Sequence, residues 1–594
     1  MNSNFNGEKG AADSGSFFLN QKNSENASQI EFHISIETAK NGKEILSING
    51  KAVHSRFAPE KEAYNIKFIA KSIIAVFGLG AGYHVKNLLL NNPDSYCIIL
   101  EPLLPIFNRR EEFLGELLNS RAFVINHIHD ENIFVLLQNL MQREFLRLET
   151  YSNLCYKNLF PQSEIEFYKI VQQHLGIVMQ NILTESNFLP LWNKNFLRNI
   201  SQTAKIPFLR NTKKSVSEKN IAVICAAGPT LDSQIAQLKE NRNKLTIFAA
   251  DTALIPLTKS GIIPDIIVSL DGQYFTMGDF ICTVPQESLC VIDALGYYDV
   301  APRFQNAVFT ISSYKENSLA NYIFRKLNII PEIVETGGTV TDYTLDLARK
   351  LGFKTFFFAG YDLSYPGLVT HCKNAPSWQS RIANSDYFAG IEDSMLKSIF
   401  TRRFKEAEAA NGKKVITDFV MDNYRNYLEY YLKSADDCVF FSASLNAVKI
   451  EGIKYLTLEN LIADYPESCR IANSFFTTET QYVNSEDIKK LFSEITSDLY
   501  QYSQQLKDNI DSILEWTQEN ISELKFLIEK ILNSYPFFKY FLLMTEIVLD
   551  RKHITQNNPE YFRHISFCLL QSVYFMIREL QKVQKINEFD VKNL

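Results

Sequence analysis

A short apolar run that passes through a turn into a helical pattern stands at the centre of this sequence. Residues 221–226 are all apolar, and the run stops at Ala227-Gly228-Pro229-Thr230. Apolar side chains then return at helical spacing, at Leu231, Ile235 and Leu238. This pattern predicts a buried strand, a tight turn and a helix. The start of such a helix is expected to offer unpaired backbone N–H groups, which suit a phosphate.

Two further apolar runs end at an acidic residue. The run at 245–250 ends at Asp251, and the run at 266–270 ends at Asp271. The carboxyl ends of parallel strands meet at one edge of an open sheet, where ligands bind. We therefore expect both carboxyl groups to line one crevice with the turn that precedes Leu231.

The alternation of strands and helices continues to about residue 470. The turn Glu335-Thr336-Gly337-Gly338-Thr339 opens a predicted helix, and polar residues at 376–425 indicate a lid or insertion followed by a helix. Strands alternating with helices imply a doubly wound, Rossmann-like parallel sheet, so residues 216–470 are predicted to form a central α/β domain. Its later strands are predicted at 289–292, 308–311, 355–359 and 438–444.

A smaller α/β pattern precedes the central one. It comprises a strand, a glycine turn, a helix and a second strand that ends at Glu101, at 73–77, 78–82, 84–90 and 97–100. An acid about twenty residues beyond the glycines is typical of a dinucleotide- or adenosyl-binding fold, in which the acid meets ribose hydroxyls. The alternative is a Rossmann-like domain whose glycines only let a helix pack closely on a strand. Both interpretations fit the sequence.

The remaining segments set the domain boundaries. Residues 1–29 are rich in Asn, Ser and Gly, which predicts a disordered tail. Residues 30–165 are then the amino-terminal α/β domain, with a hairpin around Asn41-Gly42, and residues 166–215 a helical linker. The pattern turns helical from 132 to about 211. Apolar residues recur at helical spacing from 480 to 594, which predicts a helical bundle. Such a bundle also suits a homo-oligomer interface.

Composition narrows the classes of function. The chain has 594 residues, 22% charged and 46% hydrophobic, and a formal net charge of -6. The absence of a basic block argues against nucleic-acid binding, because nothing would neutralise a phosphate backbone. Nine cysteines without a CxxC pair favour a reducing compartment and argue against a zinc site. The tail is no signal peptide and no apolar run is long enough to span a bilayer, so we expect a cytoplasmic protein.

Four motifs of the central domain resemble one known family. They are Cys225-Ala226-Ala227-Gly228-Pro229-Thr230-Leu231-Asp232, Ala250-Asp251-Thr252-Ala253-Leu254, Gly261-Ile262-Ile263-Pro264-Asp265 before Val268-Ser269-Leu270-Asp271, and Ala359-Gly360-Tyr361-Asp362-Leu363 followed by His371. Together they resemble the motility accessory factor family, bacterial proteins implicated in attaching nonulosonic acids, such as pseudaminic or legionaminic acid, to flagellin serines and threonines. The resemblance covers most of the chain. The same domain is similar to archaeal 6-hydroxymethylpterin diphosphokinase and, more distantly, to bacterial sialyltransferases that use CMP-sialic acid.

The resemblance implies which residues hold a cytidine nucleotide. Carried over from the sialyltransferases by motif, and joined by Asp362, they are Ala227, Gly228, Pro229, Thr230, Asp251, Asp271, Thr336, Gly337 and Gly338. The sialyltransferase pattern has Asn at the positions of Ala227, Asp251 and Asp271. Two carboxylates would repel a phosphate unless a divalent cation lies between them or they bind ribose hydroxyls. The sequence therefore leaves open whether Asp251 and Asp271 bind Mg²⁺.

His371 and Asp271 are the candidate catalytic residues. His371 matches the family's loop beyond a strand end, and a histidine with an ordinary pKa of about 6.5 can take a proton from a Ser or Thr hydroxyl. The alternative is a solvated bystander. Asp362 is expected to orient its loop by accepting backbone N–H groups. Thr230 and Asp251 have the alternative of capping helices, and Asp271 that of forming a turn with Gly272.

Three functions are consistent with these residues. The resemblance implies a glycosyltransferase that moves a nonulosonic acid from a CMP donor to flagellin hydroxyls. The first rival is a diphosphokinase-like enzyme, in which Asp251 and Asp271 bind magnesium with a nucleoside triphosphate. The second rival is a non-catalytic flagellin-binding assembly factor.

Overall fold

The computed structural model of the chain contains two compact units. The first comprises Met1–Asn187 and Leu542–Ile565, and the second comprises Phe188–Phe541 and Ser566–Leu594. The structure describes residues 15–18, 31–68, 71–128, 132–143, 146–210, 216–281, 284–312, 318–472, 476, 479–513, 516–517, 521–551, 554 and 558–592. Most of the predicted tail, the polar residues 213–215 and Cys282 lie outside these ranges.

The first unit begins with a small antiparallel sheet in the order β1-β2-β3-β4. β2 and β3 pair as a hairpin, and Gly42 in its turn has φ 81°, which glycine adopts without steric cost. This pairing confirms the predicted hairpin around Asn41-Gly42. The four strands are Gly15–Phe18, Glu31–Thr38, Glu44–Ile48 and Lys51–Ala52.

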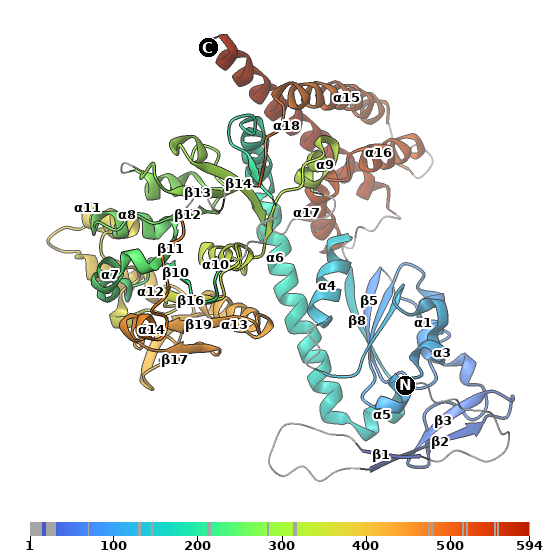
Figure 1. Cartoon of the computed structure of the whole chain (residues 1–594). Helices are drawn as coiled ribbons and strands as arrows, with labels where there is room; N and C mark the ends of the chain where they lie inside the picture. Colours follow the sequence, from blue (N-terminus) through green and yellow to red (C-terminus); the bar gives the residue numbers. More distant parts are fainter. Residues whose placement is uncertain are drawn as a thin grey trace. The chain divides into compact units, whose positions relative to one another are not determined.

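A four-stranded parallel sheet in the order β7-β6-β5-β8 forms the core of the first unit (Figure 1). The strands and helix predicted on either side of the glycine turn are confirmed by β5, β6 and α1. The four strands, in chain order, are Ser72–Phe77, Tyr96–Leu100, Ala122–Ile125 and Arg147–Ser152. The helices of this region are α1 (Tyr83–Asn91), α2 (Leu104–Phe107), α3 (Arg110–Leu114), α4 (Asn132–Arg143) and α5 (Leu154–Leu159).

β8 corrects one prediction. The sequence pattern predicts helices from 132 to about 211, and α4 and the long α6 (Pro161–Ser201) account for most of that span. Arg147–Ser152 instead form β8, which pairs in parallel with all six residues of β5. This pairing satisfies the backbone N–H and C=O groups of the buried strand β5. Such tertiary contacts override the structure that the local sequence pattern indicates.

The second unit is built on one large sheet in the order β20-β19-β16-β10-β11-β12-β13-β14-β9-β21, with β15 also paired to β14. All of its pairs are parallel except β21 with β9, which confirms the α/β class and the doubly wound sheet. Its strands are β9 (Phe208–Leu209), β10 (Ile221–Cys225), β11 (Leu245–Ala250), β12 (Ile266–Ser269), β13 (Leu289–Asp293), β14 (Ala307–Ser312), β15 (Ile333–Val334), β16 (Thr355–Ala359), β19 (Val439–Ser442), β20 (Ile453–Tyr455) and β21 (Thr480–Gln481).

Helices cover both faces of this sheet. On one face, Ile221, Val223 and Cys225 pack with apolar residues of α7 (Leu231–Glu240), α8 (Asp251–Lys259) and α14 (Leu458–Asp464). On the other face, Ala222 and Ile224 pack with α10 (Val340–Lys350) and α13 (Phe419–Ser434). Alternate residues of a strand point to opposite faces, so a strand buried on both sides reads as a continuous apolar run.

The strand order reverses between β10 and β16. From β10 the chain steps through β11, β12, β13 and β14 in one direction, and it later returns to place β16, β19 and β20 on the other side of β10. Ligands of open α/β sheets bind outside the carboxyl ends of the strands at such a switch point. The crevice is therefore expected where the turn after β10 meets the end of β16.

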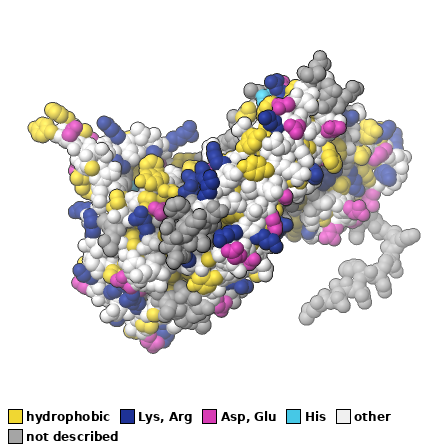
Figure 2. Space-filling model, turned by 90° about the horizontal axis from the view of Figure 1, so that it is seen from above, with side chains coloured by type: hydrophobic (Ala, Val, Ile, Leu, Met, Phe, Trp, Pro, Cys, Tyr) yellow, Lys and Arg dark blue, Asp and Glu magenta, His cyan; other side chains and the backbone are white. Residues whose placement is uncertain are grey.

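The remaining elements of the second unit are mostly helical. The segment predicted as a lid or insertion contains α11 (Pro376–Ala383), α12 (Ile391–Phe400) and the hairpin of β17 (Phe404–Glu408) and β18 (Lys414–Asp418). Of the helices predicted toward the carboxyl end, α15 (Ser485–Ser512) and α16 (Ser522–Ser534) lie in this unit. The other two, α17 (Phe538–Arg551) and α18 (Pro559–Lys592), are divided between the units, because Leu542–Ile565 belong to the first. Among the described residues, none of the helices has the length and hydrophobicity needed to cross a membrane. On the face in Figure 2, hydrophobic side chains lie between charged side chains of both signs.

Candidate functional site

The turn after β10 packs so closely on the end of β16 that a side chain does not fit. Gly228 N–H donates to the carbonyl oxygen of Gly360 at 2.8 Å. A Cβ on Gly228 would lie 2.4 Å from that oxygen and 2.6 Å from Oδ2 of Asp362. A Cβ on Gly360, which has φ 67°, would lie 2.5 Å from the carbonyl oxygen of Ala226. Backbone contacts thus fix the two strand ends at the switch point.

Asp362 occupies the start of α7. Its Oδ2 accepts the N–H of Thr230 at 2.9 Å, and its Oδ1 accepts the Thr230 hydroxyl. The next three N–H groups, of residues 231–233, donate to the carbonyl oxygens of residues 228–230. The unpaired N–H groups expected here from the sequence are therefore all bonded, and a carboxyl group stands where a phosphate was expected. Burial raises the pKa of Asp362 to about 6.

Ser444 and Gln234 extend this polar network across three strand ends. The Ser444 hydroxyl lies 2.7 Å from the Thr230 hydroxyl and accepts the side-chain N–H of Gln234 at 3.2 Å. Gln234 in turn accepts the N–H of Gly360 at 3.2 Å. The sequence marks Ser444 only as the end of a strand, because its contact with Thr230 depends on the pairing of β19 beside β16.

The loop that carries His371 is tied to the turn after β10. Cys372 N–H donates to the carbonyl oxygen of Ala227 at 2.9 Å, and Lys373 N–H donates to Oδ1 of Asp232 at 3.1 Å. The structure therefore brings His371 to the same edge of the sheet as Ala227-Gly228-Pro229-Thr230.

The environment of His371 corrects the expectation of an ordinary pKa. Its Nδ1 is buried and has no hydrogen-bond partner among the residues described. Burial, together with the guanidinium groups of Arg381 and Arg402, lowers the pKa of His371 to about 4. The imidazole is therefore neutral at pH 7, so it can accept a proton, but it is a weaker base than an exposed histidine.

Three further side chains on the segment from Thr370 to Arg381 also have a polar atom without a partner. In the described part of the chain, Thr370 Oγ1, Ser377 Oγ and Arg381 Nε are buried without a hydrogen bond. Arg381 does donate through Nη1 to the Ser394 hydroxyl at 2.8 Å. Buried polar atoms in proteins are normally bonded, so this group suits an anion that accepts from hydroxyl and guanidinium donors.

A second group of acids lies at the ends of β11 and β12. Asp251 is the first residue of α8 and is only 2% exposed; its Oδ1 accepts the Thr252 N–H and its Oδ2 accepts the Ser269 hydroxyl. Asp271 is exposed, and its Oδ1 accepts the Gln273 N–H at 2.9 Å, which is the turn weighed as its alternative. Burial raises the pKa of Asp251 to about 7, and Asp271 contributes by repulsion.

Asp279 is the member of this group that sequence reasoning missed. It lies on the short helix η4 (Tyr274–Phe280) and is 9% exposed. Burial, followed by repulsion from Asp251 and Asp271, raises the pKa of Asp279 to about 8. No hydrogen bond to its carboxyl group is formed by the residues that the structure describes. Asp251 and Asp279, whose pKa values are raised, and the nearby carboxyl group of Asp271 form a site that a divalent cation would fit.

The Thr336-Gly337-Gly338 turn lies before α10 and is partly exposed. A Cβ on Gly337 would lie 2.1 Å from the ring of Tyr427, and Gly338 has φ 106° and approaches Tyr424. Both tyrosines belong to α13, so the two glycines make room for that helix. Thr339 caps α10 by accepting the Asp342 N–H. A role in holding a nucleotide stays a prediction.

The buried side chain of Glu101 forms hydrogen bonds with the glycine turn of the first unit. Its side chain is fully buried, and Oε2 accepts the Leu79 N–H at 2.9 Å and the Tyr156 hydroxyl at 2.6 Å. Oε1 accepts the Leu103 N–H at 2.9 Å. Burial raises the pKa of Glu101 to about 7. A carboxyl group with these partners has no free side to present to ribose hydroxyls.

Aromatic rings fill the space in front of the same turn. A Cβ on Gly78 would lie 2.3 Å from the ring of Tyr156, and a Cβ on Gly80 would lie 2.5 Å from Nε2 of His54. Of the two interpretations left open by the sequence, these contacts favour close packing over ligand binding.

The fold described above agrees with comparisons to known proteins. Residues 194–367 match the family model described as 6-hydroxymethylpterin diphosphokinase MptE-like. The match includes the turn after β10, Asp251, Asp271 and Asp362. Over 93% of its length the chain is also similar in fold to the MAf glycosyltransferase from Magnetospirillum magneticum AMB-1, 92% of which is covered, with a TM-score of 0.53 and 15% identity. Both findings support the resemblance to motility accessory factors indicated by the sequence motifs.

Sequence relatives cover smaller parts of the chain. An uncharacterised protein of Treponema pallidum (strain Nichols) is 29% identical over 141 residues, which are 23% of this chain and 64% of that protein. The 6-hydroxymethyl-7,8-dihydropterin pyrophosphokinase of Methanothermobacter thermautotrophicus is 28% identical over 170 residues, which are 28% of this chain and 65% of that protein. The chain thus spans just under two thirds of the length of each.

Proposed function

We propose that this chain is a glycosyltransferase that moves a nonulosonic acid from a CMP donor to serine or threonine hydroxyls of flagellin. The observation that carries the proposal is the fold shared with the MAf glycosyltransferase over 93% of the chain. The four sequence motifs add the sugar and the acceptor by resemblance. The donor would lie at the switch point between β10 and β16, where doubly wound sheets bind their ligands.

In this proposal His371 accepts the proton of the acceptor hydroxyl while the sugar–phosphate bond breaks. Its low pKa keeps the imidazole unprotonated at pH 7, so the base is in the required form. Arg381, with the unpaired Thr370 and Ser377 hydroxyls, would hold an anionic group of the donor. Both the carboxylate of a nonulosonic acid and the phosphate of CMP have that charge.

Mg²⁺ is proposed at the acids that follow β11 and β12. Asp251, Asp271 and Asp279 would hold the ion; burial and repulsion within this group raise the pKa of Asp251 to about 7 and that of Asp279 to about 8. Bound there, Mg²⁺ would neutralise charge between these carboxylates and a phosphate.

A magnesium-dependent diphosphokinase-like enzyme is the second candidate. It is favoured by the MptE-like match over residues 194–367 and by the same three acids. In that case the site would bind a nucleoside triphosphate with magnesium instead of CMP. The two candidates therefore differ in a ligand that binding experiments can identify.

Calorimetry with CMP and with ATP, each with and without Mg²⁺, separates these candidates. We expect CMP to bind, to bind more tightly with Mg²⁺, and to lose roughly tenfold in affinity in Asp271→Asn, because phosphate and carboxylate then share no cation. The exposed Asp464→Asn, in the same unit, is the matched control and should bind as the parent does. Magnesium-dependent ATP binding without any response to CMP would rule out the glycosyltransferase.

Flagellin itself tests whether the chain catalyses transfer. In cells that carry Asp271→Ala in place of the parent chain, we expect the intact mass of flagellin to fall by the mass of its nonulosonic acid glycans. Asp271 lies at the proposed donor site, and this proposal requires no contact between Asp271 and the flagellin acceptor. Unchanged glycan mass with impaired motility would instead identify a non-catalytic assembly factor.

A further inference from the structure

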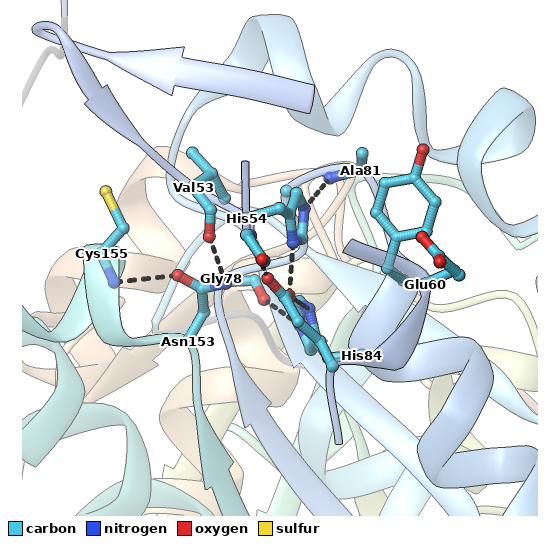
Figure 3. Close-up of polar contacts among 12 residues, drawn as sticks. Val53, His54, Glu60, Gly78, Ala81, His84, Asn153 and Cys155 are labelled. Atoms are coloured by element: carbon cyan, nitrogen blue, oxygen red, sulfur yellow. Dashed lines mark hydrogen bonds and ion pairs between the residues drawn. The ribbon is translucent and has the colours of Figure 1, made fainter. Parts of the chain in front are cut away.

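Two histidines and a glutamate converge beside the glycine turn of the first unit. His54 Nδ1 lies 2.6 Å from Oε2 of Glu62, and His84 Nδ1 lies 4.0 Å from the same oxygen. One nitrogen from each ring and one carboxylate oxygen all lie within 4.8 Å of one another. Both histidine side chains are fully buried, whereas Glu62 is 20% exposed and gives the group a path to solvent. Figure 3 shows His54 and His84 on either side of this space.

Backbone contacts hold Glu62 and His84 in place before any ligand arrives. Ser55 N–H donates to Oε1 of Glu62 at 2.6 Å, which leaves Oε2 facing the histidines. The side chain of Asn87 donates to the carbonyl oxygens of Glu60 and Glu62, both at 2.7 Å, and so ties this segment to α1. Sites that bind metals tightly have ligands oriented by such outer contacts.

His84 has a free lone pair aimed at the carboxylate. Its Nε2 lies 2.9 Å from the carbonyl oxygen of Gly78, so Nε2 carries the proton and donates it. Nδ1 then bears a lone pair, and it is buried without a hydrogen-bond partner among the described residues. Without metal, Oε2 of Glu62 accepts from His54, but the buried lone pair of His84 has no such partner, and a cation between the three side chains would satisfy it.

We propose that His54, Glu62 and His84 bind one Zn²⁺ ion. Two imidazole nitrogens and one carboxylate oxygen are a donor set that zinc takes with a fourth position left open. The Nε2–H of His84 on a backbone carbonyl is the outer contact that zinc-bound histidines usually make. The donor set differs from that of the Asp251, Asp271 and Asp279 group, which has only oxygens and suits Mg²⁺.

Zinc binding would change one hydrogen bond in the glycine turn. Ala81 N–H donates to Nε2 of His54 at 2.7 Å, so without metal the His54 proton is on Nδ1 and is donated to Glu62. When Nδ1 binds zinc, this proton moves through solvent to Nε2, which then can no longer accept from Ala81. Gly80 and Gly82, with φ 53° and 76°, flank Ala81 and let its peptide turn away.

Metal titration of the purified chain tests this proposal. We expect about one Zn²⁺ per chain by mass spectrometry of bound metal, a Co²⁺ form with the absorption of a four-coordinate site, and no competition by Mg²⁺. Glu62→Gln and His84→Ala should each weaken Zn²⁺ binding by roughly tenfold or more. The exposed His33→Asn and the neighbouring Glu60→Gln are matched controls and should bind as the parent does.

Hydrogen exchange of the Ala81 N–H is measured in the parent chain, so its result does not depend on whether a variant folds. In the parent chain, Zn²⁺ should speed hydrogen exchange of the Ala81 N–H, because its acceptor becomes a donor. A parent chain that takes up no zinc, or one whose zinc binding survives in both Glu62→Gln and His84→Ala, would overturn the proposal. In the first case a buried water would be the group that His84 faces.

Discussion

Replacing Gly228 by alanine is expected to destabilise the second unit by about 3 kcal/mol and to abolish nucleotide binding. The added Cβ would meet the carbonyl oxygen of Gly360 at 2.4 Å and the carboxyl group of Asp362 at 2.6 Å. The Gly360 carbonyl is backbone and the Asp362 carboxyl group is held by two hydrogen bonds from Thr230, so the two strand ends must separate, at a cost typical of overpacking. Thermal unfolding and CMP calorimetry of the same sample measure both effects.

Gly278→Ala is the matched control for this substitution. A Cβ on Gly278 has no heavy atom within 4 Å, and this glycine lies in the same unit. Its effect on the free energy of unfolding should stay within about 0.5 kcal/mol. If Gly228→Ala unfolded and bound CMP like the control, the turn would not be the close-packed element described here.

Asp279→Asn is expected to make the second unit more stable at pH 8 by roughly 2–3 kcal/mol and to reduce its response to Mg²⁺. The pKa of Asp279 is raised to about 8 and that of Asp251 to about 7, so the folded state holds protons that the unfolded chain has lost. In the metal-free parent, stability should therefore fall as the pH rises from about 4 to about 8. Asparagine removes one of the three charges and part of this loss.

Thermal unfolding at pH 5 and at pH 8, with and without Mg²⁺, measures this effect. Mg²⁺ should raise the Tm of the parent at pH 8 more than that of Asp279→Asn, since a ligand stabilises the state that binds it. Asp464→Asn, an exposed change in the same unit, should leave the pH profile as in the parent. Identical profiles of the parent and Asp279→Asn would mean that the three carboxyl groups do not interact.

The core of the second unit could be predicted because its strands are buried on both faces. β10 is an uninterrupted apolar run, β11 and β16 are apolar except for one threonine each, and all three lie where the sequence places them. β8 was not found, because all but one of its residues are only half-buried and its pattern is weak. β8 is a strand because it pairs with β5, and this pairing leaves no periodic pattern in the local sequence.

Only those residues of the candidate site that follow a predicted strand could be found from the sequence. Asp251, Asp271 and Asp362 follow apolar runs and were found for that reason. Asp279 follows no strand, and its position beside the other acids depends on how η4 packs against α8. The low pKa of His371 likewise depends on Arg381 and Arg402, which are 10 and 31 positions away in the chain and close only in the fold.

The hydrogen bond from Gly80 to Tyr156 also sets an order of events during synthesis. Tyr156 lies 76 residues beyond the glycine whose N–H it accepts, and the ribosome needs on the order of 4–15 s to make that stretch. Until Tyr156 has emerged, the carboxyl group of Glu101 lacks its hydroxyl donor and the glycine turn lacks the ring that covers it. The nascent first unit therefore completes its core late, and chain fragments that end before residue 156 keep a buried acid short of a partner.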